Sequence, residues 1–152
     1  MRALIQRVSE SSVVVAGENV GKIGQGLLVL LGVGKDDSER EADILTDKIV
    51  NLRVFDDEAG KMNLSLLEVG GEMLVVSQFT LFADARRGRR PSYIDAAPPA
   101  EANRLYEYFI DRTKRLGLKV ESGRFQAMMN VSLVNNGPVT IWLDTDDLKK
   151  EK

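Results

Sequence analysis

A glycine-proline pair interrupts a segment in which apolar and polar residues alternate, "MNVSLVNNGPVTIWLD". Asn-Gly flanked by such alternation favours a tight hairpin turn between two strands. Pro138 has no N–H group, so it cannot donate to a strand ladder and is confined to strand starts and edges. The segment therefore predicts strands within residues 127–143 and a turn at "NNGPVT", with Pro138 opening an edge strand. The alternative is a rigid backbone corner whose carbonyl groups face a ligand.

Strand patterns also occupy much of the remaining chain. Residues 26–33 read "GLLVLLGV" and residues 73–77 read "MLVVS", and such unbroken apolar runs are typical of buried strands. We expect further strands at residues 2–8, 12–16, 20–23, 53–55 and 119–122.

Two main helices are expected among these strands. Ser38 and Glu41 form a capping-box pattern, and four apolar residues then recur at helical spacing: Ala42, Leu45, Ile49 and Leu52. Pro98 and Pro99 are typical of a first helical turn, and Gly117 of a helix end. Because the helices do not alternate with every strand, we predict an α+β fold with a curved, largely antiparallel sheet or barrel. We expect a single domain over residues 1–152, with a frayed tail at 145–152.

The composition excludes several kinds of site. The chain has no histidine and no cysteine, which removes Ser-His-Asp and Cys-His catalysis and argues against a zinc site. We therefore expect neither metal nor cofactor, and catalysis by carboxylates, hydroxyls, lysine, backbone dipoles or the substrate itself. No apolar run reaches the roughly 18 residues of a membrane span, and "MRALIQRVSES" lacks the apolar core of a signal peptide. We expect a cytoplasmic protein without membrane contacts.

The segment "ARRGRR" concentrates positive charge in Arg86, Arg87, Arg89 and Arg90. The formal net charge is −2, and without these four residues it would be −6. Guanidinium groups bind phosphate bidentately, so the segment predicts a phosphate-binding loop on an otherwise acidic protein. The alternative is a merely solvated loop.

The motif "SQFTL", residues 77–81, lies where the chain leaves a predicted buried strand. Serine and threonine hydroxyls are poor nucleophiles without an activating base, and the motif contains no carboxylate. Backbone N–H groups at this exit are better candidates for stabilising an oxyanion. In the structural alternative, Phe79 and Leu81 lie in the core, and Ser77 and Thr80 cap a turn.

The chain resembles the D-aminoacyl-tRNA deacylase family. "SQFTL" and "NNGPVT" occur in this order, and the similarity extends from "MRALIQRV" through "GLLVLLGV", "LRVF" and "GRRPSY" to the last strand. The resemblance implies a homodimeric, barrel-like α+β enzyme that hydrolyses the ester between a D-amino acid and the 3′-terminal adenosine of tRNA.

The resemblance also implies the site residues. Gly137-Pro138 would be cis and would reach with its carbonyls into the partner subunit's active site, with Arg7 and Asn135 as support. The aminoacyl pocket would be lined by Ser77, Gln78, Phe79 and Thr80. Thr80 is the candidate catalytic residue, while the resemblance favours assistance by the ribose 2′-OH of the tRNA itself. The arginines of "ARRGRR" would bind tRNA.

A backbone corner in the space of an L side chain would reject L-aminoacyl esters of any kind and would accept glycyl esters. The sequence departs from the family pattern at "GRFQAMM", where Gln126 replaces the glycine of a Phe-Gly-Ala stretch; Asn136 stands where the pattern often has aspartate. We expect the first change to affect the adenosine pocket. Two other interpretations stay open: a non-catalytic RNA- or DNA-binding dimer module, and a structural dimerisation domain.

Overall fold

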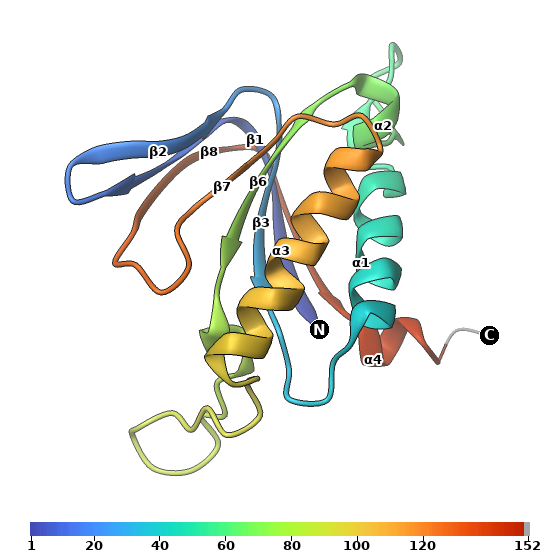
Figure 1. Cartoon of the computed structure of the whole chain (residues 1–152). Coiled ribbons are helices and arrows are strands. Elements are labelled where there is room, and N and C mark those ends of the chain that lie inside the picture. Colours follow the sequence, from blue (N-terminus) through green and yellow to red (C-terminus); the bar gives the residue numbers. More distant parts are fainter. Residues whose placement is uncertain (151–152) are drawn as a thin grey trace.

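The computed structural model describes residues 1–150 and shows an α+β fold in which a curved sheet carries helices on one face (Figure 1). The sheet order is β2-β1-β3-β6-β7, with β8 paired to β1, and β4-β5 is a separate hairpin. The strands are β1 (Arg2–Val15), β2 (Glu18–Ile23), β3 (Gly26–Gly32), β4 (Phe55–Asp56), β5 (Met62–Leu64), β6 (Glu72–Ser77), β7 (Val120–Ser122) and β8 (Asn130–Asp144). The helices are α1 (Glu39–Asn51), α2 (Leu66–Val69), the 3₁₀ turn η1 (Phe79–Phe82), α3 (Pro99–Arg115) and α4 (Thr145–Leu148).

β1 is a single strand where the sequence predicts two. Its residues 2–8 pair with β3, its residues 11–15 pair with β2, and its other edge pairs with β8. Ala3 and Ile5 belong to the large core under the helices, whereas Val8 and Val13 belong to a second core. The strand passes from one core to the other across "SES", where the register with β8 shifts, so no turn is needed.

The sheet is mixed, with three antiparallel and two parallel pairings. β6 lies parallel to β3 and β7 parallel to β6, because the connections through α1 and α3 return the chain across the sheet. Both helices cover the same face, side by side (Figure 1). Leu45 and Ile49 of α1 and Leu105 and Phe109 of α3 are fully buried there, and the apolar face predicted for α1 is confirmed.

The sheet curls into a nearly closed barrel. A Cβ atom at Gly21 of β2 would lie 2.8 Å from the carbonyl oxygen of Ser122 in β7, so this close approach requires glycine. The inside of the curl is filled by a second, smaller apolar core: Val8, Val13, Ile23, Leu28, Leu74 and Val76. The expected α+β, barrel-like fold is confirmed.

The predicted hairpin turn at "NNGPVT" is wrong. β8 runs without interruption from Asn130 to Asp144, and residues on both sides of the motif pair with β1: Val8 with Asn135 and Gln6 with Thr140. Both halves of the strand keep the same neighbour, so the chain does not reverse. Residues 136–139 instead bulge out of the ladder, where the missing N–H of Pro138 breaks no strand pairing.

The tail is more ordered than the sequence predicts. Residues 145–148 form helix α4, capped by Asp144, whose Oδ1 accepts from the N–H of Asp146 at 2.9 Å. Thr145 is fully buried, and its Oγ1 accepts from the amino group of Met1 at 2.8 Å. This contact between the chain ends stabilises a segment too short to be helical alone. The last two residues of the expected frayed tail lie outside the described part of the chain. None of the helices within residues 1–150 is long and apolar enough to cross a bilayer.

Candidate active site

The Gly-Pro corner, residues 135–140, is the bulge in β8. The peptide bond between Gly137 and Pro138 is cis, as the resemblance implied, and both residues are exposed. The side chain of Asn135 spans the bulge: its Oδ1 accepts from the N–H of Val139 at 2.8 Å, and its Nδ2 donates to Thr140 Oγ1 at 2.9 Å. The corner is therefore closed by hydrogen bonds across its own base.

Arg7 lies in β1 opposite the corner. It is 8% exposed, and its Nε donates to the carbonyl oxygen of Asn136 at 2.8 Å. Its Nη1 donates to the carbonyl oxygen of Val54 at 2.7 Å and lies 3.3 Å from Asp56 Oδ1. A buried charge needs such partners to be tolerated. The guanidinium thus ties the corner to the start of the β4-β5 hairpin.

Gly137 leaves no space for a side chain. Its φ is +138°, and an added Cβ would lie 2.9 Å from Val139 Cγ2, 3.0 Å from Arg7 Nη2 and 3.1 Å from the backbone nitrogen of Val139. The inner side of the corner is filled by its own supports, while its outer side is exposed. The corner therefore presents a rigid backbone surface to the solvent.

The exit turn, residues 77–82, contains "SQFTL". β6 ends at Ser77, and the N–H of Gln78 then donates to the carbonyl oxygen of Leu31 in β3 at 2.8 Å. The Gln78 side-chain amide donates to Thr80 Oγ1, which leaves the hydroxyl proton of Thr80 for another acceptor. No carboxylate or lysine within residues 1–150 hydrogen-bonds this hydroxyl, so its contacts suit positioning more than nucleophilic attack.

Phe79 is 55% exposed, so the structural alternative that places it in the core is wrong. Its ring packs edge-to-face on Tyr93, with centroids 5.0 Å apart. Tyr93 follows the arginine loop, residues 84–92, which is closed by paired backbone hydrogen bonds between Asp84 and Ser92. The structure therefore brings the exit turn and the arginine loop together. Sequence reasoning missed Tyr93, although a tyrosine beside an Arg-rich loop is a signal for a binding surface.

Arg86 differs from the other arginines of the loop. Its guanidinium donates to both carboxylate oxygens of Asp84, at 2.9 and 2.8 Å. This side-chain contact, followed by the Arg86 backbone N–H, lowers the pKa of Asp84 to about 2. The sequence prediction treated the four arginines alike, but the charge of Arg86 is already paired with Asp84. Arg87, Arg89 and Arg90 are exposed and form no ion pair within residues 1–150.

The Gly-Pro corner and the exit turn lie apart in one chain. The strand registers place Ser77 level with Leu31 and Ala3, whereas the corner is level with Arg7. Along the strands, the two motifs are four residues apart, from Ala3 to Arg7, which corresponds to about 13 Å. Across the sheet, they are three strand spacings apart, from β8 over β1 and β3 to β6, which corresponds to about 14 Å. The two motifs therefore do not meet within one chain.

Gln126 has a left-handed backbone, with φ +62°. A residue with a Cβ rarely adopts this conformation, which glycine adopts freely. The position where the family pattern has glycine therefore keeps a glycine-like backbone here, with a side chain added. Phe125, next to it, packs on Tyr106 of α3 with ring centroids 6.1 Å apart.

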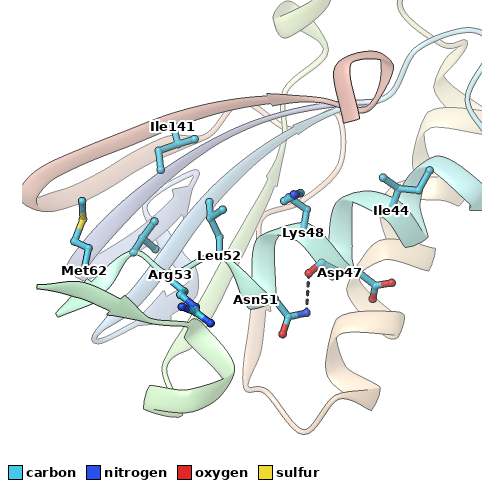
Figure 2. A pocket seen from close by; sticks show the side chains of 9 residues that line it. Ile44, Asp47, Lys48, Asn51, Leu52, Arg53, Met62 and Ile141 are labelled. Carbon is cyan, nitrogen blue, oxygen red and sulfur yellow. Dashed lines mark hydrogen bonds between the residues drawn. The ribbon is translucent and has the colours of Figure 1, made fainter. Parts of the chain in front are cut away.

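An open groove of about 690 Å³ is lined by Ile141, the residue of β8 that follows the corner (Figure 2). It lies between α1, the β4-β5 hairpin and β8, and Val54, whose carbonyl accepts from Arg7, is part of its wall. The groove combines apolar and charged side chains: Ile44, Leu52, Val54, Met62 and Ile141 with Asp47, Lys48, Asn51 and Arg53. It contains none of the site residues predicted from the sequence, and no cluster within residues 1–150 is arranged to bind a metal.

Comparisons with known proteins agree with the motifs. The family model for D-Tyr-tRNA(Tyr) deacylase matches residues 4–144. A "D-aminoacyl-tRNA deacylase" of Thermosipho africanus is 61% identical over 95% of this chain and 97% of its own length. One of Thermotoga petrophila is 57% identical over 97% of this chain and 99% of its own length.

Two solved structures share the fold. One, named "c-Myc DNA Unwinding Element Binding Protein", has a TM-score of 0.89 and 40% identity over 95% of this chain and 98% of its own. Another, described as a probable eukaryotic D-amino acid tRNA deacylase, has a TM-score of 0.81 at 16% identity, over 93% of this chain and 97% of its own, and supports the fold alone. From the family model and the identities above, the chain belongs to the D-Tyr-tRNA(Tyr) deacylase family of hydrolases.

Proposed function

We propose that the chain hydrolyses the ester of D-aminoacyl-tRNA to free amino acid and tRNA, and that the Gly-Pro corner rejects L-aminoacyl esters. The observation that carries this proposal is the corner itself, an exposed backbone surface fixed by Arg7 and Asn135. The names of relatives at 57–61% identity support the reaction. Because charged tRNA is made and used in the cytoplasm, we propose that compartment for the enzyme.

The proposed active site is shared between two subunits. The corner of one subunit lies against the exit turn of its partner, since one chain holds these motifs apart. The outer edge of β8 has no strand partner within residues 1–150, and edge strands of this length are usually covered. Val134 and Trp142 on this strand are 48% and 47% exposed. These features support a homodimer that covers β8.

Selection in this site works by exclusion. A backbone corner can occupy the space that an L side chain would need, whatever the side chain is. Each 1.36 kcal/mol of clash in the transition state gives tenfold discrimination, so roughly 5 kcal/mol would reject L-esters by about 10³ to 10⁴. Glycine has no side chain to clash, so glycyl-tRNA is also a substrate in this proposal.

Catalysis in this proposal relies on the tRNA. The chain has no histidine, and within residues 1–150 the side-chain amide of Gln78 is the only hydrogen-bond partner of the Thr80 hydroxyl. An aminoacyl ester is already activated, and the neighbouring ribose 2′-OH assists its cleavage. Ser77, Gln78, Phe79 and Thr80 line the aminoacyl pocket, with the Thr80 hydroxyl and nearby backbone N–H groups as hydrogen-bond donors to the reacting ester.

The activity is tested by incubating the protein with D-tyrosyl-tRNA and L-tyrosyl-tRNA and following ester loss without added metal. We expect rapid loss of the D ester and a rate about 10³- to 10⁴-fold lower for the L ester. Glycyl-tRNA, run in parallel, should react like the D ester. Equal loss of both tyrosyl esters, or loss of neither, contradicts the proposal.

The arginine loop is proposed to bind phosphates of the tRNA acceptor stem. Replacing Arg87, Arg89 and Arg90 with glutamine should weaken tRNA binding and lower the slope of log affinity against log salt by about two to three units. Arg86→Gln should change that slope less, because Arg86 is already paired with Asp84. Binding titrations at several salt concentrations measure both effects.

The matched control for the arginine loop replaces Lys114 and Arg115 with glutamine. These two cations are exposed at the other end of α3, away from the loop. We expect their replacement to leave the salt slope nearly unchanged. If the loop variant binds tRNA like the wild type, the arginine loop is not part of the tRNA site.

A non-catalytic nucleic-acid-binding dimer is the second candidate function. It is favoured by the name of the solved structure at 40% identity, a DNA unwinding element binding protein, and by the exposed arginines of the loop. A binding module would leave the aminoacyl ester intact or protect it, so turnover of the D ester separates the two. A purely structural dimer predicts that changes at Gly137 weaken association without altering the preference for D esters.

A further inference from the structure

The exit turn packs against two glycines, Gly32 at the end of β3 and Gly34 just after this strand. A Cβ at Gly32 would lie 3.1 Å from both the Gln78 carbonyl oxygen and Leu81 Cβ. A Cβ at Gly34 would lie 3.0 Å from two ring carbons of Phe82. The motif "LLGVG" thus lets η1 lie directly on the backbone. The buried Phe82 ring packs against these glycines at the far end of the turn.

The far end of the exit turn is held by Arg2. Its Nη1 donates to the carbonyl oxygen of Leu81 at 3.0 Å, and its Nε donates to Asp144 Oδ2 at 3.1 Å. The guanidinium carbon lies 4.4 Å from the ring centroid of Phe82 and 5.7 Å from that of Trp142. One side chain therefore joins β1, the exit turn and the end of β8.

Each contact of Arg2 has a distinct consequence. The Leu81 carbonyl closes the turn that begins at Gln78, whose N–H is bound to Leu31 at the opposite end. Asp144 is itself fixed, because its other carboxylate oxygen caps α4. The planar guanidinium holds a carbonyl, a carboxylate and an aromatic face in one fixed geometry, which the flexible, strongly hydrated ammonium of lysine reproduces only in part.

We propose that Arg2 is a positioning residue for the reaction: it holds the 3₁₀ turn so that Gln78 and Thr80 keep their places in the aminoacyl pocket. This inference rests on the proposed function of the exit turn. A four-residue 3₁₀ turn has little stability of its own. Its start is bound by the Gln78 N–H, and its end is held by the buried Phe82 ring and by Arg2, so loss of the guanidinium loosens the end next to Thr80.

The test compares Arg2→Ala and Arg2→Lys with Arg112→Ala in single-turnover hydrolysis of D-tyrosyl-tRNA by saturating enzyme. Arg112 is the matched control, because it also pairs with aspartate, here with Asp43 and Asp47, and its side chain is 32% exposed, against 31% for Arg2. We expect Arg2→Ala to lower the rate constant about 10- to 100-fold, as a small misplacement does. Its tRNA affinity should stay within about twofold of wild type, whereas a tRNA-binding role would reduce that affinity.

Two readouts separate positioning from general destabilisation. Millimolar guanidinium ion should restore part of the Arg2→Ala rate without changing its melting temperature, and Arg2→Lys should keep an intermediate rate. Asp144→Asn, which keeps the cap of α4 but weakens the hold on Arg2, should lower the rate less than Arg2→Ala. It also serves as the test if Arg2→Ala does not fold.

An activity-independent measurement completes the test. Amide hydrogen exchange of a peptide spanning residues 77–82 should be faster in Arg2→Ala and unchanged in Arg112→Ala. If Arg2→Ala has wild-type rate and exchange, or if its rate falls only in proportion to the folded fraction, the inference is overturned. If the wild type itself does not hydrolyse the D ester, the proposed function fails, and the exchange comparison still decides whether Arg2 holds the turn.

Discussion

Gly137→Ala should lower the rate of D-tyrosyl-tRNA hydrolysis by about 100-fold or more and reduce the preference for the D ester over the L ester. The added Cβ would lie 2.9 Å from Val139 Cγ2 and 3.1 Å from the backbone nitrogen of the same residue, and backbone cannot yield as a flexible side chain does. It would also press on the Arg7 guanidinium, 3.0 Å away. A displacement of about 1 Å in a positioning group is enough for a loss of this size.

The matched control is Gly60→Ala. Gly60 also has a positive φ, +75°, but an added Cβ would meet nothing within 4 Å. This variant carries the cost of alanine in an unfavourable backbone conformation, about 1 kcal/mol, without touching the corner. It should therefore keep the full rate and preference for the D ester. If Gly137→Ala keeps both as well and only weakens subunit association, the corner is a structural interface and not a selective surface.

Arg7→Met should lower the free energy of unfolding by about 2 to 4 kcal/mol and loosen the Gly-Pro corner. The substitution leaves the carbonyl oxygens of Val54 and Asn136 without their donor. A buried acceptor without a partner costs about 1 to 3 kcal/mol. Denaturant unfolding measures the loss of stability. The ratio of the hydrolysis rates of D and L esters, determined under native conditions, shows whether the loosened corner still rejects L esters.

Arg53→Met is the control for Arg7. Arg53 lies just before the β4-β5 hairpin, and within residues 1–150 its side chain forms one hydrogen bond, an exposed one to Asn63 at 3.4 Å. Surface substitutions of this kind usually change stability by less than about 0.5 kcal/mol. If Arg7→Met is as stable and as selective as Arg53→Met, the corner is held by Asn135 and the strand ladder alone.

The elements of the fold follow closely from local sequence. The N-cap pattern at Ser38, the prolines at the start of α3 and the apolar spacing of α1 predict these helices within a few residues of their observed bounds. The buried strands β3 and β6 are evident from their apolar runs. These features depend on residues that are about one helical turn or a few strand positions apart, so they can be recognised in the sequence.

The errors of sequence interpretation arise where strand neighbours decide. Asn-Gly-Pro between alternating residues is a hairpin pattern, but both halves of β8 pair with β1, so the segment became a bulge. The tail was expected to fray, but the Met1 amino group binds Thr145 and orders α4. In each case a partner more than 100 positions away outweighs the local preference, and local patterns cannot reveal such a partner.

The sequence by itself determined the fold class, the family and the chemistry that is excluded, because periodicity, motif order and the lack of histidine and cysteine can be read residue by residue. Only the tertiary structure decided which contacts surround the exit turn and the arginine loop. It exposed Phe79 beside Tyr93, paired Arg86 with Asp84 and set Arg2 against Leu81. The physical reason is that hydrogen bonds and packing act over a few ångströms in space, whereas these partners are distributed along the whole chain.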